Sequence, residues 1–233
     1  MLRVKDLHAY YGRAHILDGV SLEANAGEVV ALLGRNGAGK STAMKAIMGL
    51  VPPAKGEVSF AGTRIDKLAP YRIARLGLGY VPEDRRVFTE LSVMENLEVG
   101  RQQARDGAPL WTHEKLFSLF PNRAAMRERP GGRMSGGEQQ MLTIARTLMG
   151  NPKCVLLDEP SEGLAPIIVE QMAKSIKTLK GEGLSVILSE QNLHFSQEVA
   201  DRAYIIEKGR IRFGGSMSEL AADASLREQY LSV

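Results

Sequence analysis

The stretch that most constrains this chain is residues 34–41, which have the spacing G-x-x-x-x-G-K-[ST]. The apolar run 29–33 precedes it and is typical of a buried strand, while residues 42–48 are typical of a helix that ends at Gly49. Glycines let backbone N–H groups curl around a phosphate, and the start of the helix adds partial positive charge. The sequence therefore predicts a nucleotide phosphate site between this strand and this helix.

The residue types of this loop have distinct chemical tasks. Lys40 can reach the β- and γ-phosphates of a nucleoside triphosphate, and the hydroxyl of Ser41 can ligate Mg²⁺. A chance glycine-rich turn is the alternative, and the strand and helix that flank the motif disfavour it. The candidate nucleotide-binding residues of this segment are Gly34, Arg35, Asn36, Gly37, Ala38, Gly39, Lys40, Ser41 and Thr42.

Two acids follow a second apolar run, at residues 154–157. Asp158 and Glu159 come directly after it, and ligands in an open α/β sheet bind beyond the carboxyl ends of the strands. We expect Asp158 to hold Mg²⁺, and Glu159 to polarise an attacking water as the catalytic base. Two solvent-facing acids are the alternative, and the P-loop in the same chain favours the catalytic interpretation.

A second helix start has features of an anion site. Ser135, Gly136, Gly137 and Glu138 have the Ser-x-x-Glu spacing of a capping box, and the two small glycines would let a phosphate approach the helix N-terminus. Both roles are compatible. Because the chain already has one phosphate cradle, the second suggests that two copies, or two related chains, complete each other's sites.

Apolar strands alternate with helices along most of the chain, which predicts an α/β fold with a mostly parallel sheet. We expect one domain over residues 1–233. Residues of about 1–27 and 57–65 are predicted to form a small antiparallel β part, and about 88–150 a helical insert that includes the helix after Ser135. The remainder would form the P-loop core.

Composition excludes several classes of protein. The single cysteine, Cys154, allows no internal disulfide, and no apolar run approaches the length of a membrane span. The net charge of +3 is small, and no alternation of aromatic and basic residues argues for a nucleic-acid partner. His8, His15 and His113 show no metal-ligand spacing, so no metal beyond Mg²⁺ is assigned.

The order of these motifs resembles that of the ATP-binding cassette (ABC) ATPases over the whole chain. The resemblance rests on Tyr11, the P-loop, Glu83 at the Q-loop position, the signature at 135–138, and the Asp158–Glu159 pair. It implies that ATP is the nucleotide and that Tyr11 stacks on adenine. It also implies a head-to-tail dimer, with ATP between the P-loop of one subunit and residues 135–138 of the other. The helical insert and the Glu83 loop would touch a membrane partner.

Four positions depart from the general ABC pattern. Glu83 replaces the usual glutamine, Gln191 replaces the switch histidine, Ala165 replaces the D-loop aspartate, and Glu138 replaces the glutamine that ends the signature. The strings at 80–83, 161–166 and 190–195 resemble the LivF-type ATPases of branched-chain amino-acid importers, in which these departures are usual.

The resemblance therefore implies an ATP-hydrolysing subunit that powers import of branched-chain amino acids. It implies two separate membrane permease subunits, an extracytoplasmic substrate-binding protein, and a place on the cytoplasmic face of the inner membrane. A second ABC ATPase would complete the pair; a hetero-pair is favoured and a homodimer is possible. The alternatives are a related importer for amides, urea or aromatic compounds, a soluble ABC ATPase without a transporter, a small-molecule kinase, and a regulator that binds ATP without turnover.

The departures affect the expected chemistry. Glu83 can offer Mg²⁺ a hard oxygen but adds negative charge near the γ-phosphate. Gln191, a candidate catalytic residue, can donate an N–H to that phosphate but cannot pass a proton as histidine can. We expect this site to hydrolyse ATP more weakly than one with the usual glutamine and histidine. The offset of His194 from Gln191 makes it a surface helix position.

Overall fold

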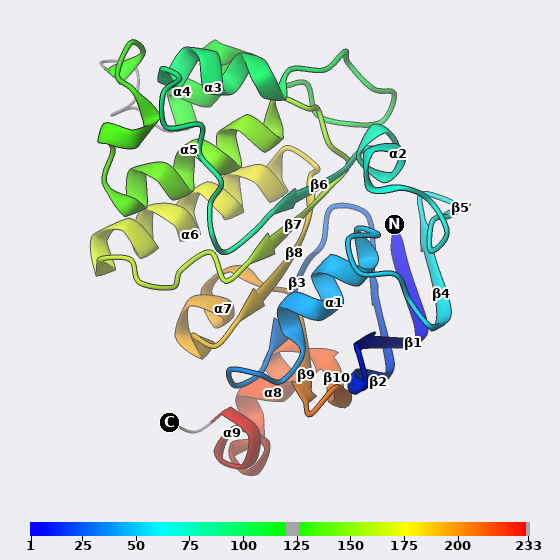
Figure 1. Ribbon diagram of the computed structural model, residues 1–233. Coiled ribbons are helices and arrows are strands. Elements are labelled where there is room, and N and C mark those ends of the chain that lie inside the picture. Colours follow the sequence, from blue (N-terminus) through cyan, green and yellow to red (C-terminus); the bar gives the residue numbers. More distant parts are fainter. Residues whose placement is uncertain (120–125, 232–233) are drawn as a thin grey trace.

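A computed structural model describes residues 1–119 and 126–231 of the chain, and it contains two sheets (Figure 1). The larger sheet has six strands in the order β10-β9-β3-β8-β7-β6. Five of them run parallel and β10 is antiparallel to β9. Their bounds are β3 Val29–Leu33, β6 Leu78–Val81, β7 Cys154–Asp158, β8 Ser185–Glu190, β9 Arg202–Glu207 and β10 Arg210–Ser216.

The smaller sheet is antiparallel, with the order β2-β1-β4-β5. It consists of β1 Leu2–Tyr11, β2 Ala14–Ala24, β4 Lys55–Phe60 and β5 Thr63–Arg64. Together the two sheets confirm the predicted fold class, an α/β fold with a mostly parallel core sheet and a small antiparallel part.

The strands of the core sheet bury both of their faces. Every residue of β3, β7 and β8 is buried, which explains why each strand contains a continuous apolar run rather than an alternating pattern. Val29, Ala31 and Leu33 join one hydrophobic cluster, and Val30 and Leu32 join the other. The two clusters therefore lie on opposite faces of the sheet.

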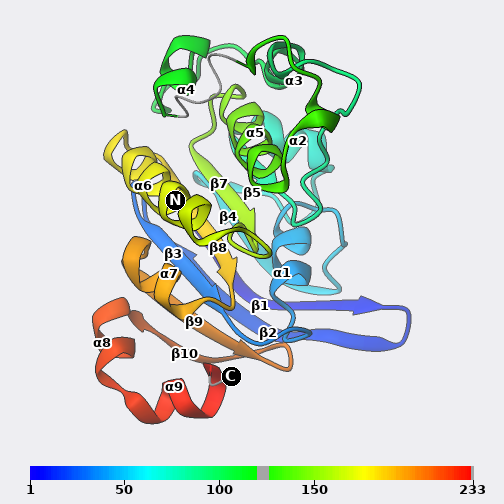
Figure 2. The ribbon, with the colours of Figure 1, turned by 90° about the vertical axis from the view of Figure 1, so that its left-hand side faces the viewer.

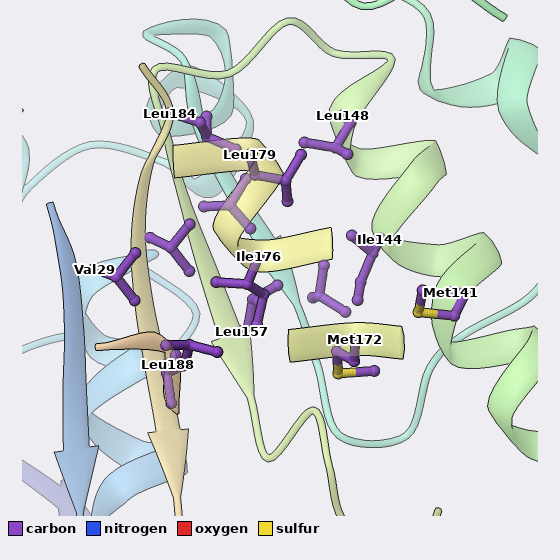
Figure 3. Close-up of a cluster of buried hydrophobic side chains, with 14 of the residues drawn as sticks. Val29, Met141, Ile144, Leu148, Leu157, Met172, Ile176, Leu179, Leu184 and Leu188 are labelled. Carbon is purple, nitrogen blue, oxygen red and sulfur yellow. The ribbon is translucent and has the colours of Figure 1, made fainter. Parts of the chain in front are cut away.

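Helices cover both faces (Figures 1 and 2). On one face α5 packs against β6 and α6 packs against β8, and Ile176 of α6 lies next to Leu157 of β7, as Figure 3 shows. On the other face α1 lies between the core sheet and the antiparallel sheet. The helices are α1 Lys40–Ile47, α2 Pro70–Arg75, α3 Val93–Gly100, α4 His113–Leu119, α5 Gly136–Leu148, α6 Pro166–Gly181, α7 Leu193–Val199, α8 Met217–Ala222 and α9 Ala224–Leu231.

Parallel pairing brings the carboxyl ends of three strands to one edge of the sheet. β3 ends where the P-loop begins, and the register places Leu33 beside Glu190 and Asp158 beside Ser189. The functional groups predicted from distant parts of the sequence therefore meet at this edge. None of the helices within residues 1–119 and 126–231 is long and apolar enough to cross a membrane.

Candidate nucleotide site

The P-loop follows β3 and ends in the first turn of α1. Its tip, Arg35–Asn36–Gly37, is exposed, whereas Ala38, Gly39 and Lys40 are buried. Gly39 has a φ of 112°, a left-handed conformation that glycine adopts without strain. At Gly34 a Cβ atom would lie 2.4 Å from the carbonyl oxygen of Ile206, so only glycine fits there. The loop thus keeps the compact shape that a phosphate cradle needs.

Lys40 points back into this loop. Its Nζ donates to the carbonyl oxygens of Gly34 at 2.7 Å and Arg35 at 3.1 Å, and it pairs with Glu159 Oε1 at 2.9 Å. The Lys40 and Glu159 side chains are only 3% and 5% exposed. Breaking such a buried pair leaves an uncompensated charge, so the ammonium group needs another anion if Glu159 leaves.

Asp158, at the end of β7, accepts hydrogen bonds from three hydroxyl groups. Its Oδ1 accepts from Ser41 Oγ at 2.9 Å and from Ser189 Oγ at 2.6 Å, and its Oδ2 accepts from Tyr80 OH at 3.0 Å. Burial, followed by the charge of Asp158, raises the pKa of Tyr80, which keeps the phenol a neutral donor.

The donors in this cluster fit Mg²⁺. Ser41 Oγ and Asp158 Oδ1 are hard oxygen ligands, and they lie 2.9 Å apart. Two neighbouring ligands of an octahedral Mg²⁺ with bonds of about 2.1 Å are separated by about 3 Å. Two of the three predicted metal residues, Ser41 and Asp158, therefore stand at a spacing that one ion can bridge.

Glu159 occupies an unusual backbone position. Its φ is 47°, and its N–H donates to the carbonyl oxygen of Ser189 at 3.1 Å. A left-handed backbone conformation is unfavourable for a residue other than glycine, and it persists only where the surrounding structure stabilises it. Gln191 Nε2 donates to Glu159 Oε2 at 2.9 Å, so the two predicted catalytic residues are in direct contact.

The predicted signature forms the N-terminus of α5. Glu138 N–H donates to Ser135 Oγ at 3.4 Å, and Ser135 N–H donates to Glu138 Oε2 at 2.7 Å, which confirms the capping box. The guanidinium of Arg85 covers Gly136 so closely that a Cβ there would lie 2.6 Å from its Nη1. Arg85 adds positive charge to this helix start, and the sequence patterns did not indicate it.

The comparisons with known proteins agree with this geometry. A family model described as ABC transporter matches residues 17–162, more than half of the chain. The chain belongs to the ABC transporter family. It is therefore an ABC ATPase, an ATP-binding and ATP-hydrolysing subunit.

Relatives match this ABC ATPase over nearly its whole length. It is 42% identical to the high-affinity branched-chain amino acid transport ATP-binding protein BraG of Pseudomonas aeruginosa, over 99% of both chains. It is 35% identical to the lipopolysaccharide export system ATP-binding protein LptB of Haemophilus influenzae, over 99% of this chain and 97% of LptB. A probable branched-chain amino acid transport ATP-binding protein LivF of Archaeoglobus fulgidus is 34% identical over 94% of both chains.

Among solved structures, the ADP conformation of MJ1267, an ATP-binding cassette of an ABC transporter, superposes with a TM-score of 0.83 at 27% identity. The match covers 98% of this chain and 97% of MJ1267. These similarities confirm the ABC ATPase fold and the predicted resemblance to LivF-type ATPases.

Besides the signature at 135–138, two more predicted site residues of the ABC ATPase, Tyr11 and Glu83, lie outside the P-loop cluster. Tyr11 ends β1 and is 49% exposed, so its ring is available for stacking. Glu83 is exposed in the segment after β6. Burial, followed by the nearby carboxylates of Glu159, Glu83 and Glu190, raises the pKa of Glu162, which places Glu83 near the acids of the site.

Glu190, at the end of β8, is a site residue that the motif analysis missed. It is buried, and burial raises its pKa. Its carboxylate accepts N–H groups from Ser161 at 2.9 Å, Gln191 at 3.2 Å and Asn192 at 3.3 Å, and so holds the segments after β7 and β8 together. The available signal was the polar pair Ser189–Glu190 after an apolar run, the same pattern that identified Asp158 and Glu159.

Two histidines meet in a way that sequence spacing does not show. His194 lies exposed on α7, as expected. His8 and His15 have no metal-ligand spacing in the sequence, but strand pairing brings His8 Nδ1 and His15 Nε2 to 3.2 Å. Sequence spacing missed this pair because the two residues lie on different strands.

Proposed function

We propose that this ABC ATPase powers import of branched-chain amino acids through separate membrane permeases. The observation that carries the proposal is the 42% identity to BraG over 99% of both chains. The second candidate function is lipopolysaccharide export, the activity named for LptB, to which the chain is 35% identical. An importer for amides, urea or aromatic compounds, or a soluble ABC ATPase, is a further alternative.

In the proposed mechanism, the phosphates of ATP enter the P-loop and form ion pairs with the ammonium group of Lys40. Lys40 then no longer pairs with Glu159. The freed Glu159 carboxylate then accepts a proton from the attacking water, while Gln191 Nε2 keeps its other oxygen in place. Ser41 and Asp158 would hold Mg²⁺, which when bound offsets the charge of the β- and γ-phosphates. Tyr80 and Ser189 orient Asp158.

The second half of the ATP site would come from another subunit. Ser135, Gly136, Gly137 and Glu138 would contact the γ-phosphate bound by the partner's P-loop, with the N-terminus of α5 supplying partial positive charge. ATP would then bind the closed pair more tightly than the open one, and hydrolysis would reopen it. We propose a hetero-pair with a related ATPase; a homodimer would use the same geometry.

A groove between α2, β6 and α3 is the proposed docking site for a permease. Its volume is about 760 Å³, and four exposed apolar side chains line it, namely Leu50, Tyr71, Phe88 and Val99. The groove is also lined by Arg75, Arg86, Arg105 and Arg146. Contiguous exposed apolar surface marks interaction sites. A short helix of a permease, on the cytoplasmic face of the inner membrane, fits this groove, and an extracytoplasmic binding protein would deliver the amino acid.

The experiment is uptake of labelled leucine by source cells that lack this chain. We expect uptake to fall in the deletion, to recover with the wild-type chain, and to stay low with Glu159→Gln. Unchanged uptake in a deletion strain that also lacks other leucine importers would overturn the proposed cargo. Labelled amides and urea, together with surface lipopolysaccharide, are measured in the same strains, so that a loss in one of them identifies the alternative.

A further inference from the structure

Two histidines and an aspartate converge on the β1–β2 hairpin, away from the P-loop cluster. His8 Nδ1 lies 3.2 Å from His15 Nε2 and 3.6 Å from Asp18 Oδ1, and His15 Nε2 lies 4.0 Å from the same oxygen. We propose that these three atoms form a binding site for a divalent transition-metal ion of the Zn²⁺ class. The proposal is independent of the transported cargo.

The ligand triangle has the dimensions that a metal requires. In a tetrahedral zinc site with bonds of about 2.1 Å, ligand atoms are separated by about 3.4 Å. The three separations here, 3.2, 3.6 and 4.0 Å, bracket that value. Three protein ligands leave the fourth position to water. Two imidazoles and one carboxylate suit Zn²⁺, Ni²⁺ or Cu²⁺ rather than Mg²⁺, which distinguishes this site from the Ser41–Asp158 pair.

Neighbouring groups already orient each ligand. His8 Nε2 lies 3.2 Å from Asp6 Oδ1, and a proton on that nitrogen leaves Nδ1 with a free lone pair for a metal. The ring of His15 stacks on Tyr10 at 4.2 Å with an interplanar angle of 6°. Arg210 Nε donates to Asp18 Oδ2 at 2.7 Å, which leaves Oδ1 facing the histidines. Such outer contacts are typical of metal sites.

The local fold explains how the three residues meet. His8 pairs directly with Asp18, and Tyr10 pairs with His15, while register shifts on both sides of His8 change the direction of the side chains. Gly19 has a φ of 78°, and a Cβ there would lie 3.1 Å from Asp6 Oδ1. Glycine at this position therefore makes room for the Asp6–His8 contact.

The charge balance also favours a cation. Asp6 lies beside His8 and Asp18 lies beside both histidines, whereas Arg210 pairs with Asp18. Arg210 is 60% exposed, so solvent screens its charge. A hydrogen bond between the two imidazoles is the competing explanation for the 3.2 Å contact, and it requires no metal.

The site is connected to the nucleotide site through the backbone. Asp18 N–H donates to the carbonyl oxygen of Gly209 at 2.8 Å, and Gly209 N–H donates to that of Ala38 in the P-loop at 2.9 Å. Tyr11 lies at the tip of the same hairpin. A bound ion would therefore fasten the two strands that present Tyr11.

The test is a Zn²⁺ titration of the full chain, without nucleotide and with excess Mg²⁺, in competition with a chromophoric chelator. His15→Phe keeps an aromatic ring on Tyr10 but removes the ligand, and Asp18→Asn removes the carboxylate. The matched control is His194→Phe, because His194 is an exposed histidine outside the cluster. Retained ATP binding verifies that each variant is folded.

We expect the wild type to bind one Zn²⁺ per chain, and His194→Phe to bind it with an affinity within twofold of the wild type. His15→Phe and Asp18→Asn should each weaken Zn²⁺ binding by at least about tenfold, because each removes one of three ligands. Absence of Zn²⁺ binding by the wild type, or wild-type affinity in either variant, would overturn the three-ligand site and leave the hydrogen-bonded histidine pair.

Discussion

At the residue scale, the central feature is one carboxylate with two partners. Glu159 is held by the ammonium of Lys40 on one oxygen and by the amide of Gln191 on the other. In the proposed mechanism, the phosphates of ATP contact Lys40, whereas Gln191 keeps its hydrogen bond to Glu159. Binding of ATP and activation of the base would then be coupled through Lys40.

The contact with Gln191 leads to a prediction. Gln191→His should raise ATP turnover of the assembled transporter several-fold, because histidine can also accept and return a proton. Gln191→Leu is the control: it loses the hydrogen bond to Glu159 and should turn over ATP more slowly than the wild type. Steady-state phosphate release measures both. If Gln191→His leaves turnover unchanged, position 191 does not limit the rate.

Tyr80 gives a second prediction at this scale. Tyr80→Phe removes the donor to Asp158 Oδ2, and a hydrogen bond to a charged group contributes about 1.5–3 kcal/mol. We expect the free energy of unfolding in urea to fall by about 1–2 kcal/mol, because Tyr80 is only half-buried. Tyr71→Phe, on the exposed surface, should change it by less than about 0.5 kcal/mol. Equal effects of the two substitutions would contradict the orienting role of Tyr80.

At the scale of elements, α3, α5 and α8 each begin with a capping box. Ser92 caps α3 and Ser135 caps α5, each with a glutamate three residues later that completes a capping box. The two boxes are alike in geometry, with Oγ–N distances of 3.2 and 3.4 Å. Their proposed roles differ, since the start of α5 would also contact the ATP of a partner subunit.

Substitutions at the starts of α3 and α5 distinguish the loss of a helix cap from the loss of a nucleotide contact. Ser92→Ala and Ser135→Ala should each lower the free energy of unfolding by about 1 kcal/mol, the usual loss of an N-cap. Ser135→Ala alone should also lower ATP turnover, by about tenfold, if its hydroxyl contacts the phosphate in the dimer. Thermal unfolding and phosphate release measure the two effects. A loss of turnover that is equal in both variants would show that capping alone explains it.

The elements also show which features a sequence can reveal. The P-loop, the capping boxes and the acids after β7 were predictable because each depends on residues close together in the chain. The contacts of Tyr80 and Ser189 with Asp158 were not, since they depend on β6, β7 and β8 lying side by side in a particular register. The contact between His8 and His15 was not predictable either, because it depends on the pairing of β1 with β2 and on the register shifts in β1.

At the scale of the whole molecule, the nucleotide edge and the apolar groove are linked through β6. Tyr80, in β6, donates to Asp158, and the same residue lines the groove proposed for the permease. The segment after β6 carries Glu83 and Arg85, which lie near the acids of the site and the start of α5. The groove and the nucleotide edge therefore share Tyr80.

The groove predicts how the chain attaches to its membrane partner. Tyr71→Glu places a charge in the groove and should release most of the chain from membranes while leaving ATP binding unchanged. Leu110→Glu is the matched control, because Leu110 is 55% exposed, against 56% for Tyr71, and lies outside the groove. Membrane fractionation of cells expressing each variant measures attachment. Release of both variants, or of neither, would argue against docking at this groove.

The measurement that tests the central claim most directly is single-turnover hydrolysis of labelled ATP by the chain assembled with its membrane partners. Glu159→Gln should retain ATP binding and lose at least about 100-fold in rate, the usual loss when a general base is removed. Glu162→Gln removes the same charge three residues further on and should stay within about threefold of the wild type. Equal rates for the wild type and Glu159→Gln would contradict the account and indicate a regulator that binds ATP without using Glu159 to hydrolyse it.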